Sequence, residues 1–343
     1  MIKLGINGFG RIGRIAMRAV YERYGEKVTV AAINTSGSME IEGWAHLLKY
    51  DSVHGVFGKK IKCQRSNTKN EEIGVMEIGE KRIPVLAQRE PRLIPWKKYG
   101  VEVVLECTGH FADKKSASAH LKAGAKKVVV SAEAKEVQDY VIGVNDEDYD
   151  GSLVIGNASC TTNCIAPMVK ILREYLGLQK AVMSTIHAYT STQRLTDDSS
   201  DDLRRARAAG INIIPTTTGA ARATVEVMPD LGGVFDGRAY RVPVVCGSVA
   251  EIVAVTSKRT TKEEVNGIFQ AASRGEYKGI VDYEEAPLVS SDIIGRSASA
   301  VFDADLTQVV DGDLVKVVAW YDNEWGYACR LVELAIRVGD GVK

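Results

Sequence analysis

Three glycines near the amino terminus, Gly8, Gly10 and Gly13, follow a short apolar segment, residues 2–7, in the spacing G-x-G-x-x-G. Residues 14–24 have helix-like apolar spacing and a β-branched run at 28–33 follows them, so the glycines lie inside a βαβ unit. There the first glycine permits a tight turn, the second lets a pyrophosphate approach the backbone, and the third allows close packing of helix on strand. The pattern predicts an α/β domain that binds a dinucleotide.

The turn after the second predicted strand bears on which dinucleotide is bound. An acid is usual about 20 residues beyond the glycines when the ribose belongs to NAD, but this chain has Asn34, Thr35 and then Ser-Gly-Ser at 36–38. A carboxylate there would repel a 2′-phosphate by roughly 1–4 kcal/mol per pair of unit charges. Hydroxyl and N–H groups would instead donate hydrogen bonds to the 2′-phosphate, which favours NADP. An ordinary turn is the alternative, because Ser, Thr and Gly are common in turns.

Cys160 lies between a short apolar strand at 153–156 and a helical run at 165–176. The free N–H groups and the positive dipole end of a helix favour a thiolate, so Cys160 is the predicted nucleophile. A buried, inert cysteine is the commoner alternative.

His187 follows the β-like run 181–186 and precedes a polar loop. Catalytic groups of α/β enzymes gather at strand ends, which makes His187 a candidate base for the thiol, although a single histidine is more often structural. The sequence alone does not bring it beside Cys160.

Composition narrows the class of protein. The chain has 343 residues, 45% of them hydrophobic, which is enough for two domains. Its formal charge is zero, with 44 basic and 44 acidic residues, so we expect neither a nucleic-acid partner nor an anionic membrane surface. The amino terminus enters a strand directly and no apolar run is long enough for a membrane helix, which suggests a soluble, cytoplasmic protein. The six cysteines and scattered histidines predict neither a disulfide framework nor a metal site.

Periodicity further along the chain predicts two different sheets. Residues 61–87 alternate around a loop at 66–72, as in a hairpin, and strands at 101–105 and 128–131 flank a helical stretch at 114–123. The later part is rich in β-like runs, at 181–186, 238–245, 251–257 and 314–321. This indicates a second, α+β domain. A polar stretch at 187–215 is longer than an ordinary connection and holds the charge run 204–207.

Together these landmarks resemble the phosphorylating glyceraldehyde-3-phosphate dehydrogenases along the whole chain. The segments that carry the resemblance are 6–14 (INGFGRIGR), 49–52 (KYDS), 106–109 (ECTG), 158–164 (ASCTTNC), 187–190 (HAYT), 202–207 (DLRRAR), 214–221 (IPTTTGAA), 241–243 (RVP) and 320–327 (WYDNEWGY). The resemblance implies a Rossmann dinucleotide-binding domain at 1–158, completed by a carboxyl-terminal helix at 324–343. It also implies an α+β catalytic domain with a mixed or antiparallel sheet at 159–323.

The resemblance implies a reaction and the residues that perform it. Cys160 would form a hemithioacetal and then a thioester with glyceraldehyde 3-phosphate, His187 would accept the hydroxyl proton, and inorganic phosphate would release 1,3-bisphosphoglycerate. The implied phosphate ligands are Ser159, Thr161, Thr218 and Gly219 for inorganic phosphate, Thr190 and Arg241 for the substrate, and Arg205 as a further anion ligand. The implied cofactor ligands are Gly8, Phe9, Gly10, Arg11, Ile12, Asn34, Thr35, Arg89, Thr108, Ser131, Ser199, Asn323 and Tyr327.

Several positions depart from the family pattern. Thr35 stands where NAD-using members usually carry an acid, and Ser199 stands where they often carry a proline. Both changes favour NADP over NAD, although acids at 197, 198, 201 and 202 lie close in sequence and could oppose a 2′-phosphate. Thr192 replaces the usual acid two residues after Thr190, and 244–247 differs from the usual threonine-proline-asparagine run.

The sequence leaves two alternatives open. The first is an erythrose-4-phosphate dehydrogenase, a relative that shares the cysteine and histidine but uses water in place of phosphate and releases a free acid. The segment 215–221 of this chain instead resembles the phosphorylating enzymes. A nucleotide-binding or RNA-associating protein without catalysis is the other, and the neutral charge gives RNA no obvious binding surface. The family further implies a homotetramer and a reversible reaction in glycolysis, or in the reductive direction.

Overall fold

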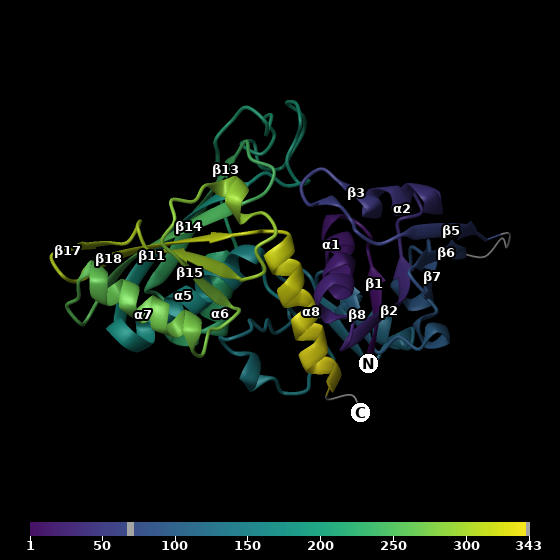
Figure 1. Cartoon of the computed structure of the whole chain (residues 1–343), viewed down its shortest axis with the longest axis horizontal. Coiled ribbons are helices and arrows are strands. Elements are labelled where there is room, and N and C mark those ends of the chain that lie inside the picture. The colour runs from purple at the N-terminus through teal and green to yellow at the C-terminus, as the bar shows by residue number, and fades with distance from the viewer. Residues whose placement is uncertain (67–71, 341–343) are drawn as a thin grey trace. The chain divides into compact units, whose positions relative to one another are not determined.

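The computed structural model describes residues 1–66 and 72–340, which form two compact units (Figure 1). The first unit comprises Met1–Tyr140, Tyr149–Ala158 and the residues from Ala328 onward, and the second comprises Val141–Asp148 and Ser159–Tyr327. No helix in the described ranges is long and apolar enough to cross a membrane.

The first unit contains an eight-stranded sheet in the order β10-β9-β8-β1-β2-β7-β6-β5. The parallel strands are β1 (Ile2–Asn7), β2 (Val28–Asn34), β7 (Lys81–Leu86), β8 (Val103–Glu106), β9 (Lys127–Val130) and β10 (Val154–Gly156). The antiparallel edge is β5 (Ile61–Arg65) and β6 (Glu72–Ile78). All residues of β8 and β9 are buried, as expected for parallel strands covered on both faces.

The predicted elements of this unit form with small shifts of their bounds. The strands predicted at 2–7 and 28–33 are β1 and β2, and the helix predicted at 14–24 begins earlier, as α1 (Arg11–Ala19), and continues as a π-helix at Val20–Tyr24. The predicted helical stretch 114–123 is two short helices, α3 (Lys114–Ala117) and α4 (Ala119–Lys122). The predicted hairpin pairs β5 with β6, but most of its loop, residues 67–71, lies outside the described residues.

Two further helices belong to the first unit wholly or in part, α2 (Ile41–Lys49) and the carboxyl-terminal α8 (Trp325–Asp340). Its other elements are short: the strand pair β3 (Tyr50–Asp51) and β4 (Gly55–Val56), and 3₁₀ turns at Pro91–Leu93 and Trp96–Tyr99. From Ala328 onward α8 belongs to this unit, where Tyr24 donates a hydrogen bond to Glu333 at 2.5 Å. Residues 341–343 of the predicted terminal helix lie outside the described chain.

The second unit contains a mixed sheet in the order β12-β13-β11-β14-β18-β16-β15, with β17 also paired to β18. Its strands are β11 (Leu178–Ala188), β12 (Ile214–Thr216), β13 (Phe235–Val242), β14 (Ser248–Thr256), β15 (Val281–Glu284), β16 (Ala300–Asp303), β17 (Gln308–Val310) and β18 (Leu314–Tyr321). The pairs β11–β13 and β15–β16 are parallel and the other pairs are antiparallel. The predicted combination of a Rossmann domain with an α+β domain and a mixed sheet is confirmed.

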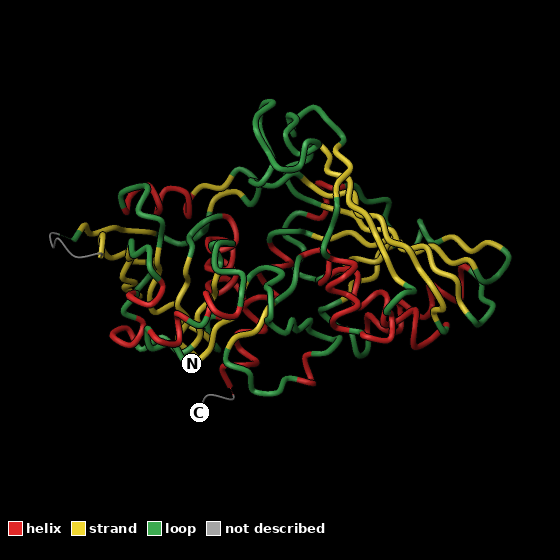
Figure 2. Tube along the Cα trace, turned by 180° about the vertical axis from the view of Figure 1, so that it is seen from behind, coloured by secondary structure: helices red, strands yellow, loops and turns green. Residues whose placement is uncertain are grey.

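Helices gather on one face of this second sheet (Figure 2). They are α5 (Cys160–Leu176), α6 (Ala220–Val227) and α7 (Lys262–Arg274). The second unit also has 3₁₀ turns at Asp146–Asp148, Pro229–Leu231 and Ser290–Ile293. The alternation in β11 shows the two faces, because Ala181 and Met183 are buried whereas Val182 between them is 59% exposed. The predicted long connection is observed, since residues 189–213 hold turns and bends but no helix or strand.

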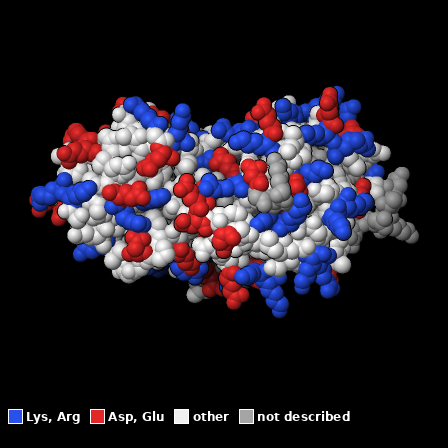
Figure 3. All heavy atoms as spheres, turned by 90° about the horizontal axis from the view of Figure 1, so that it is seen from below, with Lys and Arg blue, Asp and Glu red and all other residues white. Residues whose placement is uncertain are grey.

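Charged side chains of both signs share the surface. On the face drawn in Figure 3, Lys and Arg are interspersed with Asp, Glu and uncharged residues. This distribution matches the formal net charge of zero.

Candidate active site

A cavity of about 480 Å³ opens in the first unit at the carboxyl ends of β1 and β8. Ligands of open α/β sheets bind at such a position, where successive strands run to opposite sides of the first strand. The lining residues are Asn7, Gly8, Phe9, Gly10, Asn34, Thr35, Ser36, Trp44, Gln88, Arg89, Cys107, Thr108, His110 and Phe111. Seven of the predicted cofactor residues are among them. Three others in this unit, Arg11, Ile12 and Ser131, do not line the cavity.

The glycine motif has the geometry that a pyrophosphate requires. Gly8 has φ +94°, and a Cβ there would lie 2.7 Å from the Cys107 carbonyl carbon, while a Cβ on Gly13 would overlap the Gly8 oxygen. A Cβ on Gly10 would meet nothing within 4 Å, so this side of the turn is open. The first turn of α1 holds no acidic residue, and its N–H groups suit an anion. The residues present therefore fit a dinucleotide.

The ribose turn is built around Thr35. Its hydroxyl donates to Leu86 O at 3.0 Å and accepts from the Gly37 N–H at 3.2 Å, and the residue is buried. The Thr35 side chain thus stabilises the turn itself, whereas the Ser36 and Ser38 hydroxyls are exposed, 2.9 Å apart. Among the described lining residues there is no Asp or Glu, and Arg89 adds an exposed guanidinium.

Cys160 and His187 meet in the second unit. Cys160 is the first residue of α5, after the N-cap Ser159, whose hydroxyl accepts from the Thr162 N–H at 3.2 Å. Gly177 ends the helix in the left-handed conformation and β11 follows at once. The helix is about 24 Å long and β11 runs about 30 Å to His187, so the strand returns to the level of the helix start. The result is a distance of 3.3 Å between Cys160 Sγ and His187 Nε2.

The surroundings of this pair oppose charge on both groups. The residue Cys160 keeps some exposure, but its sulfur lies among protein atoms, and this burial raises the pKa of the thiol to about 11 against the opposing effects of Arg241 and Thr161. Burial, with a contribution from Arg241, lowers the pKa of His187 to about 3. The expectation that the helix terminus would favour a thiolate is therefore not met in the free chain, because burial of the sulfur outweighs it.

Arg241 brings a cation to the same place. Strands β11 and β13 are parallel and pair His187 with Arg241, whose Nη1 lies 2.7 Å from His187 Nδ1 and 3.0 Å from Ala188 O. No carboxylate pairs with Arg241 in the described part of the chain. Thr192, at the position of the usual acid, instead contacts the Thr190 hydroxyl at 3.0 Å. The guanidinium is therefore available to an anion.

The other predicted phosphate ligands make local contacts. The Thr161 hydroxyl is 2.9 Å from Tyr321 OH, and Thr218 Oγ1 accepts from the Ala220 N–H at the start of α6, whose N-cap is Gly219. Arg205 already donates to Thr216 Oγ1 at 2.8 Å and lies 3.5 Å from an Asp202 carboxylate oxygen. Its charge is thus shared with an acid, unlike that of Arg241.

Three predicted cofactor residues lie in the second unit. Asn323 Oδ1 accepts from Gly247 N–H at 3.2 Å and from Ser248 Oγ at 2.9 Å, which fixes its amide. Tyr327 is buried, while Ser199 is exposed and its carbonyl accepts from Arg194.

The acids near Ser199 are partly engaged elsewhere. Asp197 contacts Arg207 at 2.8 Å, and Asp202 accepts from the Thr216 hydroxyl at 3.0 Å. These contacts reduce the repulsion that the two carboxylates could exert on a 2′-phosphate.

Two aromatic residues at these sites, Tyr321 and Trp44, are not among the residues predicted from the sequence. Tyr321 OH bonds to Thr161 and to Thr185 Oγ1 at 2.8 Å, and its ring lies edge-on to His187 with centroids 5.9 Å apart. Tyr321 ends the predicted strand 314–321 on the same face as the buried Val317, so alternation could have indicated it. Trp44 lines the cofactor cavity from α2, and no pattern in the sequence pointed to it.

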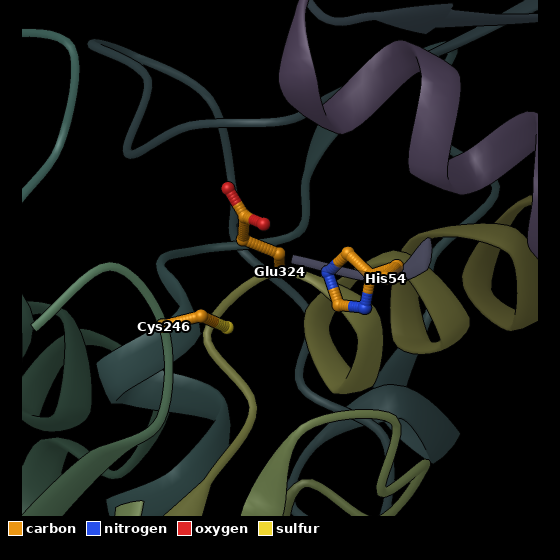
Figure 4. A group of neighbouring side chains, drawn as sticks. All are labelled: His54, Cys246 and Glu324. Atoms are coloured by element: carbon orange, nitrogen blue, oxygen red, sulfur yellow. The ribbon is translucent and has the colours of Figure 1, made fainter. Parts of the chain in front are cut away.

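The divergent segment 244–247 forms a hydrogen bond of its own. The Cys246 thiol donates to Asp322 Oδ1 at 3.1 Å and is buried, which raises its pKa. Glu324 of the same unit lies within 4.8 Å of this sulfur (Figure 4).

Comparison with known proteins gives the family. Residues 2–114 match the family model for the NAD binding domain of glyceraldehyde 3-phosphate dehydrogenase, and residues 159–323 match the model for its C-terminal domain. The chain belongs to the glyceraldehyde 3-phosphate dehydrogenase family. The resemblance inferred from the sequence is confirmed, and the chain is an oxidoreductase with a nicotinamide-dinucleotide domain.

Relatives match over nearly the full length. The chain is 49% identical over 343 residues to glyceraldehyde-3-phosphate dehydrogenase of Streptomyces coelicolor and 47% identical over 342 residues to glyceraldehyde-3-phosphate dehydrogenase 1 of Streptomyces avermitilis, with 99% of each chain covered. It is 46% identical over 337 residues to the chloroplastic glyceraldehyde-3-phosphate dehydrogenase A of Chlamydomonas reinhardtii, covering 97% of this chain and 88% of that protein. The matches to both domain models and to relatives over nearly their full length therefore show the family.

Proposed function

We propose that this chain catalyses the reversible, phosphorylating oxidation of D-glyceraldehyde 3-phosphate to 1,3-bisphosphoglycerate, with Cys160 as nucleophile and His187 as base. The main support is the pair itself, with Sγ 3.3 Å from Nε2 and the Arg241 guanidinium 2.7 Å from the other ring nitrogen. A thiol, an imidazole and a guanidinium that has no carboxylate partner among the described residues suit a substrate with an aldehyde and a phosphate.

In the first half-reaction the Cys160 sulfur bonds to the aldehyde carbon. His187 Nδ1 would donate to Ala188 O, 2.6 Å away, which leaves Nε2 as the nitrogen that can accept a proton. The thiol proton then passes through His187 Nε2 to the carbonyl oxygen, which gives a hemithioacetal. A bound nicotinamide dinucleotide supplies the acceptor for the hydride that leaves this carbon. His187 takes the hydroxyl proton as the hydride leaves, and the carbon remains on Cys160 as a thioester.

In the second half-reaction inorganic phosphate attacks the thioester carbon. The acyl group moves to a phosphate oxygen, the sulfur leaves as a thiolate, and the proton on His187 returns to it. Ser159, Thr161, Thr218 and Gly219 would hold the attacking phosphate, and Arg205 would serve as a further anion ligand.

Arg241 and Thr190 would hold the phosphate of the substrate, and Arg241 would also couple that binding to catalysis. The positive charge of Arg241 contributes to the low pKa of His187. A substrate phosphate on the guanidinium would offset this charge, so His187 would become a stronger base when the substrate is bound.

The cofactor would be NADP or NAD, with NADP favoured. The cavity wall has Ser36 and Arg89 and no acid among its described residues, so a 2′-phosphate would meet hydroxyl and cationic groups. Asn323 and Tyr327 would contact the nicotinamide end, and Ser199 the ribose of a neighbouring subunit in a homotetramer. Residues 1–158 with 324–343 would form the cofactor domain and 159–323 the catalytic domain, and a cytoplasmic location stays a prediction.

The experiment is a comparison of initial rates of cofactor reduction with glyceraldehyde 3-phosphate, using NADP and NAD in turn, with and without inorganic phosphate. We expect turnover that requires phosphate, a higher kcat/KM with NADP, and no turnover by Cys160→Ser. Oxidation that continues at full rate without phosphate would instead favour the erythrose-4-phosphate dehydrogenase reaction type, and equal or better use of NAD would refute the cofactor preference.

A further inference from the structure

A buried carboxylate lies beneath the wall of the cofactor cavity, and nothing in the proposed mechanism uses it. Glu106 is the last residue of β8, is 1% exposed, and has no Lys or Arg partner in the described part of the chain. The cost of burying such a group must be met by hydrogen bonds.

Four donors surround this carboxylate. Oε2 accepts from Asn7 Nδ2 at 2.5 Å and from His120 Nε2 at 2.8 Å, and Oε1 accepts from the Thr108 N–H at 2.8 Å and from the Thr108 hydroxyl. The donors come from the ends of two neighbouring strands and from α4. Both oxygens are therefore needed as acceptors.

The hydrogen on His120 is fixed by Trp96. The indole Nε1, which can only donate, lies 3.0 Å from His120 Nδ1. Nδ1 is therefore an acceptor, the ring hydrogen is on Nε2, and His120 donates it to Glu106. His120 and Trp96 are both fully buried, so neither ring contacts solvent in this arrangement.

The same hydrogen bonds continue into the cavity wall. Thr108 Oγ1 donates to Glu106 and accepts from the His110 N–H at 3.0 Å. These two hydrogen bonds fix the rotamer of the Thr108 side chain. Asn7 donates to Glu106 and accepts from Asn34 Nδ2 at 2.7 Å, and Asn34 is held in turn by both backbone groups of Gln88. Five residues tied to Glu106 in this way, directly or through one another, line the cavity: Asn7, Asn34, Gln88, Thr108 and His110.

We propose that Glu106 is a positioning residue for the dinucleotide, which acts by holding Asn7 and Thr108, and through Asn7 the residue Asn34, in the conformation that the bound cofactor requires. The inference rests on the proposed use of a nicotinamide dinucleotide. It adds a role for a carboxylate that does not itself line the cavity.

Glu106→Gln is the direct test, because the amide keeps the shape but turns one acceptor into a donor that faces donors. We expect the Kd of NADPH and of NADH, measured by equilibrium fluorescence titration without aldehyde, to rise at least about 10-fold. With saturating cofactor, kcat should stay within about threefold, because Cys160 and His187 are unchanged. The matched control is Asp303→Asn in the second unit, a carboxylate equally buried that accepts from Trp320 Nε1 at 2.9 Å, and it should leave both Kd values unchanged.

A second pair of variants decides the question if Glu106→Gln does not fold. His120→Gln keeps an N–H donor for Glu106, whereas His120→Leu removes it, so only the leucine variant should weaken cofactor binding. A lower thermal midpoint with unchanged Kd, in Glu106→Gln or in His120→Leu, would show a structural role only and overturn the proposal. Binding of both cofactors by a wild-type chain that does not oxidise glyceraldehyde 3-phosphate would refute the proposed reaction alone, whereas a wild-type chain that binds neither would refute both.

Discussion

Replacing His187 by glutamine should change how the stability of the protein depends on pH. His187 is 4% exposed, and burial lowers its pKa from 6.5 to about 3. In the unfolded chain the same imidazole has its ordinary pKa, so the unfolded state binds more protons between these two values. Stability should therefore fall as the pH drops through this window, and the loss should be absent from His187→Gln, whose amide does not titrate.

The size of the effect follows from the two pKa values. At pH 7.5 both states of His187 are neutral, whereas at pH 5 the unfolded imidazole is almost fully protonated and the folded one is not. Proton binding by the unfolded imidazole therefore lowers the free energy of unfolding by about 2 kcal/mol at pH 5 relative to pH 7.5. All other titrating groups are shared by the two proteins, so their contributions cancel in the comparison.

The assay is urea unfolding of wild type and His187→Gln at pH 7.5 and pH 5, with free energies taken from midpoints and slopes. Wild type should lose about 2 kcal/mol more than the variant on acidification. Cys160→Ser should behave as wild type does, because a thiol with a pKa of about 11 does not titrate in this range. A wild type that gains stability relative to His187→Gln at pH 5 would refute the reasoning, because it would require a protonated His187 paired with a thiolate.

Three further predictions concern the two sites. Gly10→Ala should leave the thermal midpoint within about 2 °C but weaken NADPH binding, because the added Cβ would meet only the open side of the turn. Gly13→Ala should lower the midpoint, because its added Cβ would overlap Gly8 O. Equal midpoints for the two variants would contradict this. Ser36→Asp should lower the NADP to NAD ratio of kcat/KM about 10-fold or more by repulsion of a 2′-phosphate, and an unchanged ratio would place that phosphate elsewhere. Arg241→Met should slow iodoacetamide modification of Cys160 at pH 8 several-fold, since Arg241 opposes the rise of the thiol pKa; an equal or faster rate would show that its charge does not reach the sulfur.

Local patterns in the sequence were sufficient for much of the fold. The strand at 2–7, the glycines at 8, 10 and 13, and the strand at 28–33 are β1, the turn before α1, and β2. Runs of β-forming residues likewise indicated β11, β13, β14 and β18. The bounds of β18 are as predicted, and those of the other three differ by a few residues. These elements follow from the spacing of apolar residues and from glycine conformations, which depend on near neighbours in the chain.

The environment of Cys160 could not be derived in the same way. The position of this residue at a strand-to-helix turn was predicted correctly, but the predicted thiolate is not favoured, because the pKa depends on how much protein surrounds the sulfur. The role of Thr35 was similarly undecided, since only the fold shows that its hydroxyl bonds to Leu86 and Gly37 inside the turn.

The sequence by itself therefore determined the family, many but not all of the strands and helices, and the candidate nucleophile. Tertiary structure alone decided that β11 returns His187 to within 3.3 Å of Cys160, that β13 brings in Arg241 from 54 positions along the chain, and that a buried Glu106 joins the ends of β1 and β8. The physical reason is that strand register, desolvation and buried hydrogen bonds are set by residues far apart in sequence, and no local pattern encodes them.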